Sequence, residues 1–231
     1  MISNKYKCIF VHIPKTGGQS IENFFLSLHG LDWESRSSLL LRFNENPKLG
    51  PERLAHLMAS EYVRFGYTSQ SEFDSYYKFA FVRNPFSRLV SEYKYRNHDK
   101  SMSFKKFVME NLPVKNSYTD AYRHIIPQYD YIHNNKGELL VDFVGKLETF
   151  QKDFDYVCSC LGLSDSRLPH VNSTSKNNNL SVKNKLKRLL MFKRSETQPY
   201  SDYYDKELKE VVAEMYKKDI EKFEYSFDSK D

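Results

Sequence analysis

Three short apolar runs along the chain predict the buried strands of a sheet. Residues 6–13 (YKCIFVHI) form a nearly continuous run of apolar and β-branched side chains, and residues 78–83 (KFAFVR) and 139–144 (LLVDFV) repeat this character. Runs of this kind, without polar alternation, are typical of parallel strands that are covered on both faces. The first run leads into the glycine-containing stretch PKTGGQS, so a sharp turn is expected directly after the first strand.

Apolar positions spaced three and four residues apart predict the helices that follow these strands. In the first helix we expect Ser20 at the N-cap, Ile21, Phe24 and Leu28 on the apolar face, and Gly30 at the end. The predicted helices cover residues 20–30, 51–66, 85–96, 103–112, 148–162 and 202–223. Weaker periodicity makes residues 31–50, 113–137 and 164–184 connections, the first with room for a short helix.

Strands that alternate with helices predict an α/β fold. We expect a single domain over residues 1–231, built as a three-layer parallel sheet with helices on both faces. A chain of 231 residues can bury a sizeable core without disulfides or metals. Eight Gly, eight Pro and three Cys are too few for a collagen-like, low-complexity or disulfide-scaffold protein.

The chain contains no apolar run of about 18 residues, the length that crosses a bilayer as a helix. Its start has a short apolar run and lacks the small-residue cleavage site of a signal peptide. The chain has an odd number of cysteines, Cys8, Cys158 and Cys160, and we expect them to be free thiols. Together these features predict a soluble cytoplasmic protein; a membrane-peripheral protein and the truncated catalytic part of a membrane-anchored enzyme stay open as alternatives. The net charge of +5 agrees with an anionic ligand and equally with a solvated surface, so charge alone decides nothing.

The segment HIPKTGGQS, residues 12–20, is the strongest candidate for a binding site. A strand that turns sharply into a helix exposes backbone N–H groups at the helix N-terminus, and such a turn binds anions. Lys15 adds a positive charge, Gly17 and Gly18 allow close approach of the backbone, and Thr16, Gln19 and Ser20 offer polar side chains. The segment differs from a Walker A loop because its lysine precedes the glycine pair. A tight structural turn with an exposed lysine remains the alternative.

A second candidate, FVRNPFSRLVSEY at residues 81–93, follows the second predicted strand. Arg83 can form bidentate hydrogen bonds with a phosphate. Ser91 lies about two helical turns further on, so its place beside Arg83 depends on how the helix folds back. Arg88 is expected to be an exposed helix arginine rather than a third contact. Two anion-binding strand ends in one sheet indicate a ligand with phosphate or sulfate at both ends.

Taken together, these segments resemble the sulfotransferases that use 3′-phosphoadenosine 5′-phosphosulfate (PAPS), especially the branch that sulfates carbohydrates. HIPKTGG is similar to the 5′-phosphosulfate loop of that branch, a P-loop-like turn, and FVRNPFSRLVSEY to its 3′-phosphate segment. Further weak similarities follow in order: LAHLMASEY with His56, PQYDYI with Gln128, FVGKLETFQKDF at residues 143–154, LPHVNST at residues 168–174 and the closing DIEKFEYSF. The resemblance covers most of the chain.

The resemblance implies roles for particular residues. The phosphosulfate of PAPS would be held by Lys15, Thr16, Gly17, Gly18, Gln19 and Ser20, and its 3′-phosphate by Arg83 and Ser91. Lys15 and the turn amides can stabilise the charge that builds up during in-line sulfuryl transfer. A neutral histidine suits the removal of the acceptor proton, and His56 is the candidate base. His12 could orient the loop or pack beneath it, and His170 could line the cofactor or acceptor cleft. His124 and His133 stay open as acceptor-side residues, and Glu61 as another base or a solvated helix carboxylate.

Neither a metal nor a specific nucleic acid is expected as a partner. The chain lacks HExxH, paired CxxC and acidic calcium-loop patterns. The expected partner is a saccharide or glycan acceptor. The basic stretch at residues 182–194 is expected to be an amphipathic surface helix, and an acceptor-side patch for an acidic glycan, an interfacial membrane contact and nonspecific nucleic-acid affinity stay open as alternatives. Specificity is expected in the connections 31–50, 95–137 and 164–200. A kinase-like phosphotransferase and a noncatalytic binding module remain the alternative functions.

Overall fold

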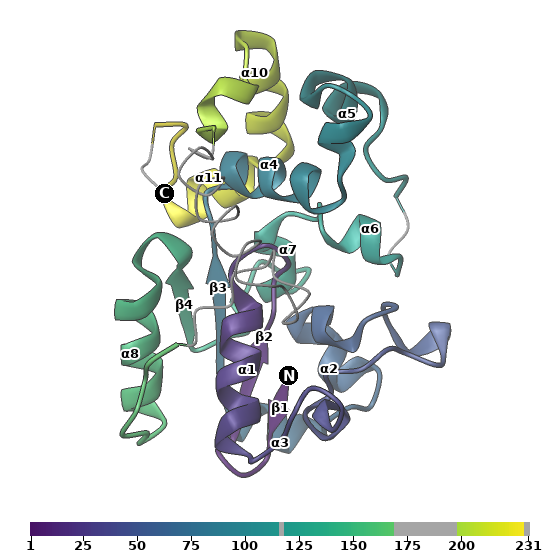
Figure 1. Cartoon of the computed structure of the whole chain (residues 1–231). Coiled ribbons are helices and arrows are strands. Elements are labelled where there is room, and N and C mark those ends of the chain that lie inside the picture. The colour runs from purple at the N-terminus through teal and green to yellow at the C-terminus, as the bar shows by residue number, and fades with distance from the viewer. Residues whose placement is uncertain (116–117, 169–197, 229–231) are drawn as a thin grey trace, which may run out of the picture.

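A four-stranded sheet lies at the centre of the computed structural model, which describes residues 1–115, 118–168 and 198–228 (Figure 1). The strands are β1 (Ile2–Ser3), β2 (Cys8–Val11), β3 (Tyr77–Val82) and β4 (Phe143–Lys146), in that spatial order. β2, β3 and β4 are parallel, whereas β1 pairs antiparallel with β2. The prediction of an all-parallel sheet is therefore wrong at one edge, because residues 4–7 turn the chain back on itself as a hairpin.

The third strand begins later than predicted. The first part of the run that predicted a strand over residues 139–144 lies outside β4. Leu139 forms an isolated bridge to His133, and Val141 packs into the core before β4 starts. Gly145 lies within β4, where an added Cβ would stand 2.5 Å from the Phe81 ring. The end of the apolar run, Phe143 and Val144, thus belongs to β4, and Gly145 allows the strand to approach the Phe81 ring closely.

Side chains alternate between the two faces of the sheet and create two core clusters. On one face Phe10, Phe79 and Phe81 pack against α1 (Gly18–Leu28) and α8 (Phe150–Cys160). On the other face Val11, Ala80 and Val82 pack against α2 (Ala59–Arg64) and α7 (Gln128–Ile132). This alternation is the period-two geometry of strands, and it gives the predicted three layers.

A third core cluster is formed by side chains of helices that lie beyond the carboxyl ends of the strands (Figure 1). Its elements are α4 (Pro85–Tyr95), α5 (Phe104–Glu110), α10 (Lys206–Met215) and α11 (Lys217–Phe223). The prediction of a single helix over residues 202–223 is wrong, because the helix is interrupted at Tyr216, between α10 and α11. The Tyr216 ring is buried, and its hydroxyl donates to the Ile125 carbonyl 2.8 Å away.

The helix predicted over residues 51–66 is also divided. A 3₁₀ turn, η3 (Leu54–His56), is followed by extended backbone at Leu57 and Met58 before α2 begins. The Glu61 carboxylate accepts a hydrogen bond from the Met58 N–H at 2.8 Å, which fixes the new helix start.

Several short elements lie in the predicted connections. The 31–50 connection contains η1 (Arg36–Leu39) and η2 (Pro47–Leu49), as expected for a stretch with room for a short helix. The sequence pattern missed α3 (Gln70–Ser75), α6 (Asp120–Arg123) and α7 because each is shorter than two turns. The remaining 3₁₀ turns are η4 (His98–Lys100), η5 (Leu147–Thr149) and η6 (Tyr200–Tyr203).

Cys8 and Cys158 are buried and Cys160 is exposed, and all three are free thiols, as predicted. Within the described residues, the helices are too short or too polar for any of them to traverse a bilayer.

Candidate functional site

Both predicted anion-binding segments begin at the same edge of the sheet. β2 ends at Val11 and β3 at Val82, and the two strands are parallel neighbours, with Val11 paired to Ala80. The turn that contains Lys15 and the segment that starts at Arg83 therefore leave the sheet side by side. This geometry is the carboxyl-end crevice in which open α/β sheets bind ligands.

The turn after β2 has a strained backbone. Lys15 has φ 71° and Gly17 has φ 81°, both in the left-handed region, which is costly for lysine. The Thr16 side chain is fully buried, and its hydroxyl donates to the Ile13 carbonyl at 2.8 Å. Thr16 thereby holds the turn closed.

The helix after this turn starts without a side-chain cap. Gly17, not the predicted Ser20, is the N-cap of α1, and the Ser20 N–H donates to the Gly17 carbonyl at 3.0 Å. Since glycine has no side chain to accept from the first-turn amides, the N–H groups that precede Ser20 in this turn are available to an anion. Gln19 and Ser20 are half-buried in the same first turn.

Gly18 leaves room for a histidine beneath the turn. An added Cβ at Gly18 would stand 2.2 Å from the His12 ring, so any larger residue would collide with the imidazole. His12 Nδ1 lies 2.6 Å from Glu22 Oε1 on α1. His12 therefore packs under the turn and ties the end of β2 to the following helix.

Lys15 lies among positive charges. Its ammonium stands 3.9 Å from the centroid of the Tyr95 ring. Burial and, to a smaller extent, the charges of Arg83, Arg96 and Arg88 lower the pKa of Lys15 to about 8, against the opposing effect of Glu92. Such a concentration of cations favours the binding of an anion, which would also restore the lysine to its charged form.

Arg83 is fixed through its backbone. Its N–H donates to Gln128 Oε1 and its carbonyl accepts from Gln128 Nε2, both at 2.8 Å. The fully buried Gln128 is held in turn by Asp219 on α11, whose carboxylate accepts from the Gln128 N–H at 2.9 Å. Arg83 precedes α4 and Ser91 lies within it, and both side chains are half-buried.

Arg88 corrects a prediction. It is 1% exposed rather than a surface arginine. Its guanidinium donates to three backbone carbonyls, those of Pro14, Ile126 and His124, at 3.0, 3.0 and 2.9 Å. Arg88 therefore joins the turn after β2 to α4 and to the segment after α6. Spacing on the helix could not reveal this, because the partners are carbonyls far away in the sequence.

Three buried histidines form a row behind the turn. The His56 ring lies 5.1 Å from the His12 ring and 5.0 Å from the His124 ring, measured between centroids, and both contacts are edge-to-face. Each imidazole has a carboxylate at Nδ1: Glu22 beside His12, Asp120 beside His56 and Glu92 beside His124. The candidate base is thus one member of a packed cluster.

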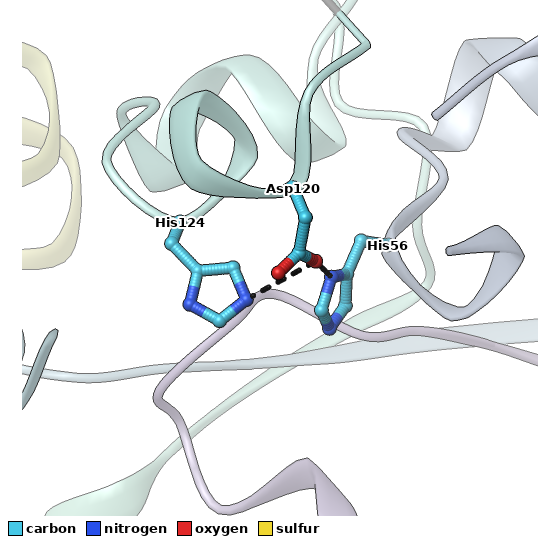
Figure 2. A group of neighbouring side chains, drawn as sticks. All are labelled: His56, Asp120 and His124. Carbon is cyan, nitrogen blue, oxygen red and sulfur yellow. Dashed lines mark hydrogen bonds and ion pairs between the residues drawn. The ribbon is translucent and has the colours of Figure 1, made fainter. Parts of the chain in front are cut away.

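Asp120 is the shared acceptor in this cluster (Figure 2). Its Oδ1 lies 3.2 Å from His56 Nδ1 and 3.5 Å from His124 Nε2. Burial by itself would raise the pKa of Asp120, but hydrogen bonds with His124 and His56 hold it well below its usual range. Asp120 is therefore an anion that fixes the orientation of the His56 ring.

His56 is neutral at ordinary pH. Burial, together with the neighbouring His12 and His124, lowers its pKa to about 3, against the opposing effect of Asp120. With Nδ1 directed at Asp120, Nε2 is the nitrogen that remains to accept a proton. His56, His12 and Gln19 together line a small pocket, so the imidazole has access to a ligand.

His56, Asp120 and His124 could also act as metal ligands, since they place one ligand atom each within 4.8 Å of one another. However, Asp120 lies 3.0 Å from Arg96 Nη2 and 3.5 Å from Arg53 Nε. A divalent cation would sit beside two guanidinium groups that repel it. The residues therefore fit a hydrogen-bonded cluster better than a metal centre, and the expectation of no metal stays a prediction.

The other candidate residues are not part of the histidine row. Glu61 forms a bidentate ion pair with the buried Arg123, with N···O distances of 2.6 and 3.0 Å. Because both of its carboxylate oxygens are engaged, Glu61 is unsuited to act as a base. His133 stacks on Tyr129, with ring centroids 3.7 Å apart, and its Nδ1 lies 2.9 Å from the Tyr129 carbonyl. His170 and the basic stretch 182–194 lie outside the described residues.

Comparisons with known proteins bear on this geometry. Residues 1–226 match the family model described as the Sulfotransferase family. The matched region includes the turn after β2, Arg83, Ser91 and the histidine row. A protein of Archaeoglobus fulgidus, which is named only as an uncharacterized protein, is 34% identical over 110 residues, or 46% of this chain and 84% of that protein.

Proposed function

Because the chain belongs to the sulfotransferase family, we propose that it transfers a sulfuryl group from PAPS to a hydroxyl group of a saccharide. One observation carries this proposal: two cationic segments, at Lys15 and at Arg83, leave neighbouring parallel strands beside a buried neutral histidine. Fixed positive groups and a neutral base are what sulfuryl transfer to an alcohol requires.

In this proposal the two segments bind opposite ends of the sulfuryl donor. The first-turn amides of α1, together with Lys15, Thr16, Gly17, Gly18, Gln19 and Ser20, hold the 5′-phosphosulfate, as a P-loop-like turn would. Arg83 and Ser91 hold the 3′-phosphate. Neighbouring strands are about 4.8 Å apart, so segments that leave adjacent strands can reach a single nucleotide.

The reaction is a single displacement at sulfur. The acceptor oxygen forms a bond to sulfur while the bond between sulfur and the bridging phosphate oxygen breaks. The acceptor proton passes to Nε2 of the neutral His56, and 3′-phosphoadenosine 5′-phosphate (PAP) leaves with the electron pair of the broken bond. Lys15 and the turn amides stabilise the negative charge that develops on the leaving oxygen.

Asp120 supports the base in two ways. Its hydrogen bond at Nδ1 selects the tautomer of His56 that leaves Nε2 unprotonated. Its negative charge then stabilises the imidazolium that forms when His56 takes the proton, as a carboxylate behind a catalytic histidine does. Burial is the main cause of the low pKa of His56, and the negative charge of a bound donor would raise it.

A sulfation assay tests this function. The protein is incubated with PAPS and a panel of saccharides, and sulfated product and released PAP are measured together. We expect product with the wild type, and a loss of about 10²- to 10⁴-fold in kcat for His56→Ala, the range for a general base.

The control is His133→Ala, which removes another buried histidine outside the row. It is expected to retain the wild-type rate. Transfer undiminished in His56→Ala would reject the base, and magnesium-dependent ATP turnover without any use of PAPS would reject the function.

A further inference from the structure

An exposed aromatic ring stands beside the lysine of the turn after β2. Tyr95 is the last residue of α4, and its side chain is 48% exposed. The Lys15 ammonium stands 3.9 Å from the centroid of this ring, well within the roughly 6 Å over which a cation and an aromatic face attract each other. None of the donor contacts proposed above uses Tyr95.

The Lys15 ammonium has few other contacts. In the part of the chain that the structure describes, no hydrogen bond or ion pair reaches it. Glu92 is the carboxylate whose charge favours the ammonium, but its two oxygens lie 2.6 Å from His124 Nδ1 and 2.5 Å from Arg96 Nε. The Tyr95 ring is therefore the group that fixes the position of the ammonium.

The Tyr95 ring is itself held by the histidine row. It stacks on the His124 imidazole, with centroids 5.6 Å apart and 22° between the planes. His124 is buried, its Nδ1 lies 2.6 Å from Glu92 Oε2, and its carbonyl accepts from Arg88 Nη2 at 2.9 Å. A ring that stacks on so firmly held an imidazole has a defined orientation, which a freely rotating surface tyrosine lacks.

The surroundings of Lys15 favour an uncharged partner of this kind. Burial opposes the charge of the ammonium, and Arg83, Arg96 and Arg88 oppose it as well. The face of an aromatic ring is electron-rich but carries no net charge, so it stabilises the ammonium without cancelling the positive potential that attracts an anion. A carboxylate in the same place would repel the donor.

Contact with the ring leaves the ammonium able to bind a ligand. An ammonium group has three N–H donors, so a ring on one side leaves donors for an anion on another. The lysine stem is long and flexible, and an ammonium that is already held in place loses less conformational freedom when a ligand binds. The ring is therefore expected to preorganise Lys15.

We propose that Tyr95 is a positioning residue of the donor site, and that its ring holds the Lys15 ammonium in place for the 5′-phosphosulfate. The inference rests on the proposed sulfuryl transfer and adds a residue to the donor side of that site. Tyr95 acts through Lys15, so its effect on binding disappears when the lysine charge is removed. The ring is the active part, and the hydroxyl group is dispensable.

A double-mutant cycle on PAP affinity tests the assignment. Calorimetric titration at pH 7 compares Tyr95→Leu with the wild type, and then measures the same substitution in a Lys15→Met background. We expect Tyr95→Leu to weaken PAP binding by about 5- to 20-fold in the wild type and by less than about twofold in Lys15→Met. Equal losses in the two backgrounds, or no loss in the wild type, would overturn the inference.

Tyr95→Phe and Tyr203→Leu are the controls. The first keeps the ring and removes only the hydroxyl group. Tyr203, on η6, also has a lysine over its ring, with Lys94 Nζ 4.9 Å from the centroid. Both variants are expected to bind PAP within about twofold of the wild type. A loss in either control as large as the loss in Tyr95→Leu would show that the Tyr95 ring has no special role.

The pH dependence of PAP binding is a readout that a purely structural role of Tyr95 would leave unchanged. Lys15 is charged below its pKa of about 8 and loses the charge as the pH rises through that value. Without the ring, Glu92 alone opposes the three arginines and burial. The fall in affinity is therefore expected to begin about 0.5 to 1 pH unit lower in Tyr95→Leu, as the loss of a cation–π contact would cause.

An identical pH dependence in Tyr95→Leu and the wild type would contradict the inference. Failure of the wild type to bind PAP at any pH would instead contradict the proposed function itself.

Discussion

Lys15 is the residue whose charge state depends most directly on its surroundings. Burial and three neighbouring arginines bring its pKa down to about 8, so the ammonium is charged below that pH and neutral above it. An arginine at the same position stays charged throughout the accessible range.

We therefore predict that PAP binding weakens as the pH rises above about 8, approaching a tenfold loss per pH unit, because one proton must be taken up with the ligand. Titration calorimetry between pH 7 and 9.5 measures this. Lys15→Arg is expected to give a constant affinity over the same range. A wild-type affinity that does not change up to pH 9.5 would show that the Lys15 charge plays no part in binding.

The buried Arg88 has a structural role, because it holds together the backbone segments around the site. Its three hydrogen bonds to backbone carbonyls would all be lost in Arg88→Met. We predict a decrease of about 3 kcal/mol in the free energy of unfolding, at about 1 kcal/mol for each carbonyl left without its donor.

Urea denaturation measures this change, and Arg64→Met is the comparison. Arg64 is exposed, so its replacement is expected to change the free energy of unfolding by less than about 0.5 kcal/mol. Similar values for the two variants would mean that Arg88 behaves as the surface arginine that its helix position suggested.

For single residues, the sequence pointed to the polar and charged side chains near the site more readily than to the residues that contact them. The turn residues around Lys15, and Arg83 at the next strand end, lie together as strand order predicts. Gln128 belonged to a recognised segment, but its hold on the Arg83 backbone joins positions 45 residues apart in the sequence. The contact of Asp120 with His56 spans 64 residues and has no local signature.

Among the elements, the turn after β2 is the most tightly constrained. His12 occupies the space that a side chain at position 18 would need. We predict that Gly18→Ala lowers the free energy of unfolding by about 1–3 kcal/mol, the cost of overpacking, and weakens PAP binding by displacing the turn.

A double-mutant cycle with His12→Ala isolates this contact. Since removal of the imidazole restores the space, the two substitutions together should cost less than their sum by at least about 1 kcal/mol in the free energy of unfolding. Additive costs would show that the close approach of His12 to Gly18 does not constrain the turn.

The elements that the sequence predicted well are those with long, regular patterns. β2 and β3 fall within their apolar runs, and α4 begins at Pro85, where a missing N–H costs nothing. Predictions failed where a local capping contact starts a new helix, as at Met58, where a helix ends beside a tertiary contact, as at Tyr216, or where an apolar run packs into the core ahead of its strand, as at Val141. The apolar pattern alone does not reveal these contacts.

For the whole molecule, strand order creates the proposed site. The order β1-β2-β3-β4 makes β2 and β3 neighbours, so two segments that are about 70 residues apart in the chain leave the sheet together. The C-terminal helix α11 contributes as well, because Asp219 holds Gln128, which holds Arg83. The site thus depends on contacts from both ends of the described chain.

The central claim is that one nucleotide bridges Lys15 and Arg83. Calorimetric binding of PAP and of adenosine 5′-monophosphate, which lacks the 3′-phosphate, to the wild type and to Arg83→Ala tests it most directly. The account predicts that Arg83→Ala weakens PAP binding by about 10- to 100-fold, as loss of a charge-assisted hydrogen bond would, and changes binding of the monophosphate by less than twofold. Equal losses for both ligands, or no loss for either, would contradict it.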